Sequence, residues 1–236
     1  MKKVLFFIAL LFLSGRFGQA QSLTVEYNIG HGTYQMSDMK KRLKNQQLPV
    51  TNAQVTDLFP GYVTQDTRVG FEWRRHQAGV LFSYMNTAGK TGITDYSGSC
   101  NYELRDKGYK FGIFYRFCLV KEKISIFTFE PYVQLSTGVV LNRVQEANRL
   151  FVESDPTVGY QLETCFSGKN FFVEPAFGIK FGLCRRVALN VSVAYEWDVV
   201  KQKHQRQDPG LPSTFNVDWS GYRAQAGLIF YLNLKK

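Results

Sequence analysis

The sequence predicts an all-β protein: an eight-stranded antiparallel up-and-down transmembrane β-barrel with one short amphipathic helix in its first external loop. Three observations predict it. The first 20 residues look like an export leader, the polarity of the remaining chain alternates at every second residue, and long connections alternate with short ones. Because successive side chains of a strand point to opposite faces, a strand between lipid and a polar interior alternates in this way.

Composition narrows the class of protein before any motif is considered. The 236 residues are 44% hydrophobic and 15% aromatic, which is too apolar for a disordered chain. After residue 20 the sequence has no apolar run of about 18 residues, so it predicts no helical membrane span. Four cysteines are too few for a small disulfide scaffold. One domain of about 200 residues is therefore expected, and its mean hydropathy of −0.21 suits strands that are half polar.

The first 20 residues are predicted to be a Sec signal peptide, which leaves residues 21–236 as the barrel domain. A basic start, an apolar run over residues 4–13 and small residues at Gly18 and Ala20 support this prediction. The alternative is an uncleaved anchor helix, which Arg16 disfavours because it interrupts the apolar run. Cleavage after Ala20 removes three basic residues and no acid, so the net charge falls from +10 to +7. An exported chain of this kind is not expected to bind nucleic acid.

Eight stretches are expected to be strands with an apolar face toward lipid and a polar face toward the interior. They are residues 23–34, 61–74, 77–88, 99–118, 124–143, 170–184, 187–200 and 217–234. Short turns near residues 75–76, 120–123 and 185–186 alternate with long loops at 35–60, 89–98, 144–169 and 201–216. An even number of strands, with short turns on one side and long loops on the other, is typical of outer-membrane barrels.

A soluble eight-stranded barrel with an apolar interior is the competing fold. It would bury the charged face of every strand around a ligand, which is costly unless the charges are paired. It would also expose the phenylalanine- and valine-rich face to water as one very large apolar patch. Placing the apolar face against lipid removes both problems, so the membrane barrel is favoured.

The chain resembles the small eight-stranded OmpA/OmpX-like or PorT-like barrels of Gram-negative outer membranes. The resemblance is carried by the leader, the alternating strands, residues 30–40 and 94–98, and the final strand over residues 221–234. It implies the fold and a location in the cell outer membrane, and it implies no activity. The chain departs from many members at its end, where Leu234 is followed by two lysines in place of the terminal aromatic residue that the assembly machinery reads.

Charged residues at inward positions are predicted to form a lumen charge network with five acids and five bases. They are Glu26, Arg68, Glu72, Lys110, Arg116, Glu130, Glu174, Lys180, Glu196 and Arg223. An eight-stranded barrel is just wide enough for its own side chains, so this balanced set is expected to fill the lumen with ion pairs. The alternative is a narrow channel for ions or small solutes.

The loop over residues 35–60 is expected to hold the amphipathic helix. Met36, Met39 and Leu43 have helical spacing, and Ser37 or Asp38 can cap the first turn. The basic face of this helix consists of Lys40, Lys41, Arg42 and Lys44. Two interpretations stay open: these residues contact phosphates of the outer-leaflet glycolipid, or the helix packs over the barrel mouth with its lysines in water.

Cysteines and histidines give weaker hypotheses. Cys100 and Cys165 are both expected on the outer side, where they could form a disulfide or stay free. Cys118 and Cys184 are expected on strands two apart, too distant for a disulfide.

A lipid-modifying enzyme at the outer rim would need a nucleophile beside a base, and His31 with Ser37 or Ser97 is the candidate set. Because spacing alone does not bring such groups together, we assign no catalytic residue. The four cysteines and three histidines are dispersed, so we assign no metal ligand and no cofactor either.

Aromatic residues near the strand ends are expected to form two interfacial belts. The inner belt is Trp73, Phe117 and Phe230, and the outer belt is Tyr62, Trp197, Trp219 and Tyr222. The expected function is that of a monomeric, non-catalytic barrel with a structural or surface-interaction role through loops 35–60 and 144–169. Its expected partners are outer-membrane lipid and an external molecule of unknown identity.

Overall fold

Strands dominate the computed structural model, which describes residues 22–45, 54–120, 122–124, 127–154, 159–201, 205–206 and 215–232. The predicted leader, residues 1–20, lies outside the described residues. In the part of the chain that is described, no helix is both long enough and apolar enough to cross a bilayer.

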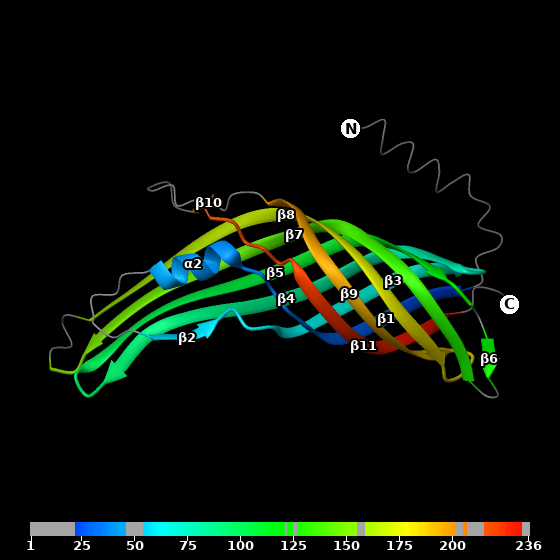
Figure 1. Cartoon of the computed structure of the whole chain (residues 1–236), viewed down its shortest axis with the longest axis horizontal. Coiled ribbons are helices and arrows are strands. Elements are labelled where there is room, and N and C mark those ends of the chain that lie inside the picture. The colour runs from blue at the N-terminus through cyan, green and yellow to red at the C-terminus, as the bar shows by residue number, and fades with distance from the viewer. Residues whose placement is uncertain are drawn as a thin grey trace.

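Eight long strands form a closed antiparallel ring (Figure 1). They are β1 (Ser22–Gly32), β3 (Tyr62–Trp73), β4 (His76–Asp95), β5 (Gly98–Cys118), β7 (Phe127–Val152), β8 (Tyr160–Gly182), β9 (Val187–Lys201) and β11 (Gly221–Leu232). Each strand pairs with the next long strand of the chain, and β1 pairs with β11 to close the ring, with Leu23 opposite Leu232. The predicted up-and-down barrel of eight strands is confirmed.

One helix and three short strands are added to this ring. The helix α2 (Ser37–Asn45) lies where the sequence predicts it. The short strands are β2 (Gln54–Leu58), which pairs with β4, β6 (Glu122–Ile124), which pairs with β7, and β10 (Gln205–Arg206), which pairs with β8.

Four neighbouring strands are longer than predicted. β4 and β5 continue to a tight turn at Tyr96 and Ser97, and β7 and β8 extend to Val152 and from Tyr160. The predicted long loops at 89–98 and 144–169 are therefore wrong, because most of these residues continue the sheet beyond one side of the ring (Figure 1). We call this extension, residues 86–107, 143–152 and 160–169, the outer wall.

The two faces of a strand exchange polarity where it passes from the ring into the outer wall. In the ring, the outward residue Ile113 of β5 is 61% exposed. In the wall, the same outward face carries Glu103 and Lys107, while the inward Tyr102 and Leu104 are fully buried. The alternation itself is unbroken, so the strand is continuous and only the surrounding medium changes, from apolar to water.

The interior consequently has two parts. The half near the short turns is polar, whereas the half near the outer wall is a hydrophobic core that α2 covers. This outer core consists of Tyr34, Met36, Met39, Leu43, Phe59, Leu81, Met85, Tyr102, Leu104, Phe114, Val140, Val144, Phe166, Phe172, Phe215, Val217 and Trp219. The expectation of a polar interior throughout is wrong for this half.

Trp219 shows the same correction at a single residue. It was expected in the outer aromatic belt, but it is fully buried, and its strand begins only at Gly221. Its indole packs over Gly108, where a Cβ would lie 3.0 Å from the ring. A larger residue at that position would displace the indole from the centre of the outer core.

Candidate functional site

The predicted lumen residues all lie inside the ring. All ten are buried, with exposed fractions of 6% or less. Each occupies an inward position of its strand, because the alternation that turns apolar neighbours toward the outside turns these side chains toward the centre.

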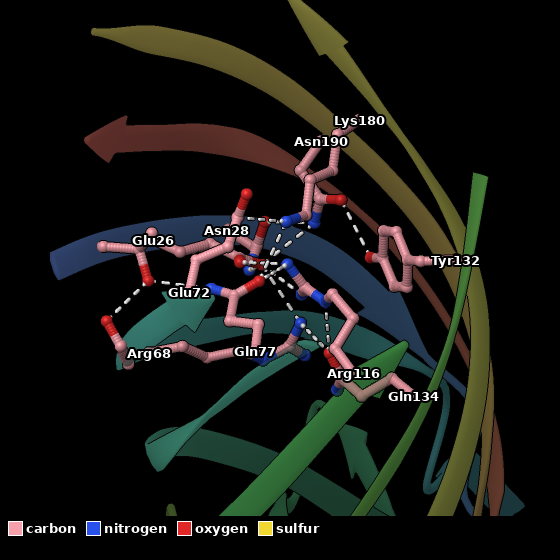
Figure 2. A network of polar contacts seen from close by, with 12 residues as sticks. Glu26, Asn28, Arg68, Glu72, Gln77, Arg116, Tyr132, Gln134, Lys180 and Asn190 are labelled. Atoms are coloured by element: carbon pink, nitrogen blue, oxygen red, sulfur yellow. Dashed lines mark hydrogen bonds and ion pairs between the residues drawn. The ribbon is translucent and has the colours of Figure 1, made fainter. Parts of the chain in front are cut away.

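Glu26 lies at the centre of the polar half (Figure 2). Its carboxylate accepts hydrogen bonds from Arg116 at 2.9 Å and from Arg68 at 3.1 Å. Asn28 and Asn190 donate to it at 2.7 and 2.9 Å. Most of these bonds fall on one carboxylate oxygen, Oε1, while Arg116 also donates to Oε2, so both oxygens are engaged.

Amide side chains join the charged groups, and they are residues that the sequence reasoning missed. Gln77 accepts hydrogen bonds from Arg116 at 3.1 Å and from Lys180 at 2.9 Å, and Lys180 also pairs with Glu72 at 2.9 Å. Gln134 accepts from Arg116 at 2.9 Å. The available signal was parity, because both glutamines occupy the same inward positions as the charged residues.

A second cluster lies where the polar half meets the outer core. Lys110 donates to Glu174 and, at 2.8 Å, to Glu196. Arg223 lies 3.4 Å from Glu196, and the Lys110 ammonium lies 4.3 Å from the ring centroid of Phe172. Two cations thus hold two carboxylates across the lumen, directly below the aromatic side chains.

Arg42 fastens α2 to the inside of the outer wall. Its guanidinium donates to Glu146 at 2.7 Å and to the hydroxyl of Tyr102 at 3.3 Å. It also lies 5.1 and 5.7 Å from the ring centroids of Phe215 and Phe166. Burial opposes its charge, but Tyr102 and Glu146 outweigh burial and raise the pKa of Arg42. Arg42 is therefore engaged within the protein.

The remaining basic residues of α2 divide into two kinds. Lys40 donates to the backbone oxygen of Tyr34 at 3.3 Å, whereas Lys41 and Lys44 are exposed. Met39 and Leu43 are buried beneath the helix. The structure therefore has the helix packed over the barrel mouth, and contact of its lysines with glycolipid stays a prediction.

Of the two possibilities left open for Cys100 and Cys165, the structure has the free thiols and not the disulfide. They lie on β5 and β8 with β7 between them, opposite Leu150 and Gln145 of β7. That offset is about 16 Å along the strands, and a disulfide tolerates a Cα separation of only about 7 Å. Cys118 and Cys184 are free as well.

His31 and the two candidate serines are not joined by any hydrogen bond in the described part of the chain. The Ser97 hydroxyl donates to Asp95 at 2.6 Å in the turn at the far end of the outer wall. The strand register puts this turn about 30 Å beyond the level of His31. Across the described residues, no group of three or more histidines, cysteines or acids is arranged to hold a metal ion.

The outer wall carries a shallow hollow of about 450 Å³. It is lined by Thr56, residues 90–94, residues 101–103, Ala147 and Arg149. Within it, Glu103 lies 3.9 Å from Lys90 and 2.8 Å from Arg105. Hydroxyl, amide and charged groups make this hollow suited to a polar ligand.

These features define the class of protein. A closed antiparallel ring with an apolar outer surface and a filled interior, whose strands extend into water on one side, is a β-barrel of the outer-membrane type.

Solved structures of several outer-membrane proteins are similar to this chain, including the following three. Neisserial surface protein A is 11% identical, with a TM-score of 0.40 over 89% of this chain and 97% of that one. OprG from Pseudomonas aeruginosa is 10% identical, with a TM-score of 0.45 over 91% and 97%. The outer membrane protein AlkL in lipid bilayers is 11% identical, with a TM-score of 0.37 over 92% and 93%. No protein family and no curated protein matches the sequence.

Proposed function

We propose that the chain is an exported, monomeric outer-membrane protein without catalytic activity. Its filled lumen does not conduct, and its outer wall has a structural or surface-interaction role. The observation that carries this proposal is the filling of the lumen by two different materials, ion pairs in one half and a hydrophobic core in the other.

The two fillings oppose the passage of an ion for different physical reasons. In the polar half, Glu26 and Lys110 are held by several partners, so an ion would have to replace their bonds. In the outer core, the large apolar side chains of Trp219 and Phe172 fill the space, and entry of an ion would cost its hydration. The helix α2 covers the mouth above both.

The outer wall supports the interaction role. The start of β1 and the end of β11 lie on the same side of the ring as the short turns (Figure 1). The outer wall projects from the opposite side, which is external in outer-membrane barrels. The wall is rigidly paired, polar on its outer face and hollowed near Lys90 and Glu103. This surface suits recognition of an external polar molecule.

Two measurements test the proposal. Membrane fractionation with gel mobility before and after heating should place the protein in the outer membrane and give a heat-dependent shift. A soluble fraction without a shift would overturn the barrel assignment. In planar bilayers the folded protein should give no steady conductance, and steady conductance at the level of an open pore would replace the closed lumen with a channel.

A further inference from the structure

Three basic residues meet on the outward face at the boundary between the apolar ring surface and the outer wall. Lys107 on β5 is directly opposite Arg143 on β7. Lys169 on β8 is opposite Leu141 and therefore diagonal to Arg143. Directly opposed side chains have Cβ atoms about 5 Å apart, and diagonal ones about 7 Å. We call these three residues the boundary triad.

Like charges in direct opposition destabilise a sheet unless a counter-charge lies between them. The boundary triad has no such counter-charge within the described chain, whose ion pairs include none of its three members. The outward-facing acids on the same strands are Glu103 and Glu163, about 13 and 20 Å further along the wall. Those acids are already paired with other bases.

The position of the boundary triad identifies the missing anion. Two residues nearer the short turns than the triad member of the same strand lie Tyr109 on β5, Leu141 on β7 and Phe171 on β8, which are 39%, 38% and 42% exposed on the apolar surface. The Tyr109 ring packs against that of Tyr84, at 5.4 Å between centroids. Tyrosine at this depth is typical of the membrane interface. The triad therefore lies at the level of the lipid headgroups.

We infer that Lys107, Arg143 and Lys169 form a binding site for phosphate groups carried by a lipid of the outer leaflet. The inference rests on the proposed insertion into the outer membrane. It assigns the contact to the outer surface of the sheet, whereas the sequence suggested α2. Arg143 and Lys169 are exposed and can reach the anion, and arginine is well suited to phosphate because its guanidinium donates two parallel hydrogen bonds.

The test uses the full mature chain folded in phosphatidylcholine nanodiscs that contain a minor fraction of bis-phosphorylated lipid A. After extraction, mass spectrometry counts the lipid A molecules retained per protein. The triple variant Lys107→Gln, Arg143→Gln, Lys169→Gln should retain about tenfold less lipid A than the wild type. Lipid A without phosphates should not be retained by either protein.

Matched controls carry the same loss of charge elsewhere. The triple variant Arg74→Gln, Arg75→Gln, Arg185→Gln changes exposed residues of the short turns and should retain lipid A like the wild type. The double variant Lys41→Gln, Lys44→Gln tests whether α2 contributes to binding. This variant should also retain lipid A like the wild type. If the triple boundary variant does not fold, Arg143→Gln alone should still reduce retention, and Lys107→Arg with Lys169→Arg should preserve it.

The outcomes are separable. Equal retention by the wild type and the folded boundary variant overturns the inference and leaves the proposed function intact, whereas failure of the wild type to insert overturns the proposed function itself. Competition by free inorganic phosphate shows that phosphate alone is sufficient, and absence of competition shows that the lipid is needed. Binding of an acidic protein to the triad in place of lipid A also overturns the inference.

Discussion

Asp106 is a buried carboxyl group to which no side chain of the described residues donates a hydrogen bond. It is fully buried at an inward position of β5 in the outer wall, and neither of its carboxylate oxygens is hydrogen-bonded. Burial, with a smaller effect from Asp198, raises the pKa of Asp106 well above its usual range, and the nearby backbone N–H of Lys107 opposes this rise only in part. The folded state therefore binds this proton more tightly than the unfolded state. Stability consequently falls as the pH rises from about 4 toward the raised value.

Asp106→Asn should remove this pH dependence. We expect the free energy of unfolding to rise by about 1–3 kcal/mol at pH 8, because the carboxyl group is ionised in the unfolded chain and disfavoured as an ion in the folded one, whereas an amide of the same shape stays neutral in both. The gain should be smaller at pH 5, because there the carboxyl group of the unfolded chain is closer to its own pKa and the difference between the two states is smaller. Urea titration of the protein in vesicles, followed by tryptophan fluorescence, measures both values.

The control for this prediction is Asp95→Asn in the turn at the end of the outer wall. Hydrogen bonds from Ser97 lower the pKa of Asp95, so this substitution should bring no gain in stability at either pH. A loss of stability in Asp106→Asn at pH 8 would contradict the argument, because it would mean that the charged form of Asp106 is stabilising.

At the scale of elements, the sequence predicted the ring strands better than the outer wall. Each ring strand has an apolar outward face, so period-two alternation sufficed to find it. In the wall, alternation persists through the buried Tyr102, Leu104 and Phe166, but the apolar side is now the inward one and it is interrupted by polar residues. The exchange is explained by what covers that face, namely α2 together with Phe59, Phe215 and Trp219, and a single strand's sequence does not contain those contacts.

The residues of the candidate site also divide into those that the sequence predicted and those that it did not. The ten lumen residues could be selected because parity alone turns them inward. The sequence could not predict the partners of Arg42 or the distance between Cys100 and Cys165, because both depend on the register of β5, β7 and β8. The boundary triad was missed for the same reason, since its members are far apart in the sequence and are joined only by strand pairing.

Arg42→Ala should loosen α2 without unfolding the barrel. The substitution removes the bonds to Glu146 and Tyr102 and the contacts with two aromatic rings. We expect proteinase K to cut within residues 37–45 about tenfold faster, because the loss of a charge-assisted contact favours local opening. Mass spectrometry of the early fragments measures the rate.

Lys44→Ala is the control for the helix, because Lys44 is exposed and has no ion pair among the described contacts. Its cleavage rate should match that of the wild type. Equal protection of the Arg42→Ala protein would show that the burial of Met39 and Leu43 is enough to hold the helix.

At the scale of the whole molecule, the lumen is filled by the ion pairs of the polar half and by the outer core, and each part is held by its own contacts. Glu26→Ala should therefore destabilise the protein without opening it. Removing this carboxylate leaves Arg68 and Arg116 without a central partner, and breaking a buried pair in this way costs about 3–5 kcal/mol. Conductance should still be absent, because the outer core and α2 are unchanged. Urea titration and planar-bilayer recording measure the two effects.

The comparison for this prediction is Glu163→Ala on the outer wall, whose pair with Arg149 at 3.6 Å is largely exposed. It should cost no more than about 1 kcal/mol. A steady current through the Glu26→Ala protein would assign the whole barrier to the polar half.

The outer wall is an open sheet in water, and open sheets tend to recruit strands from other molecules. Beyond Tyr84 the edge of β4 no longer pairs with β3, and β2 covers part of it instead. On the other side, β10 pairs with β8 next to the last residues that β9 reaches. These short strands occupy backbone groups that would otherwise be templates for aggregation. We therefore expect less edge-to-edge pairing between crowded copies in one bilayer than bare strand edges would give.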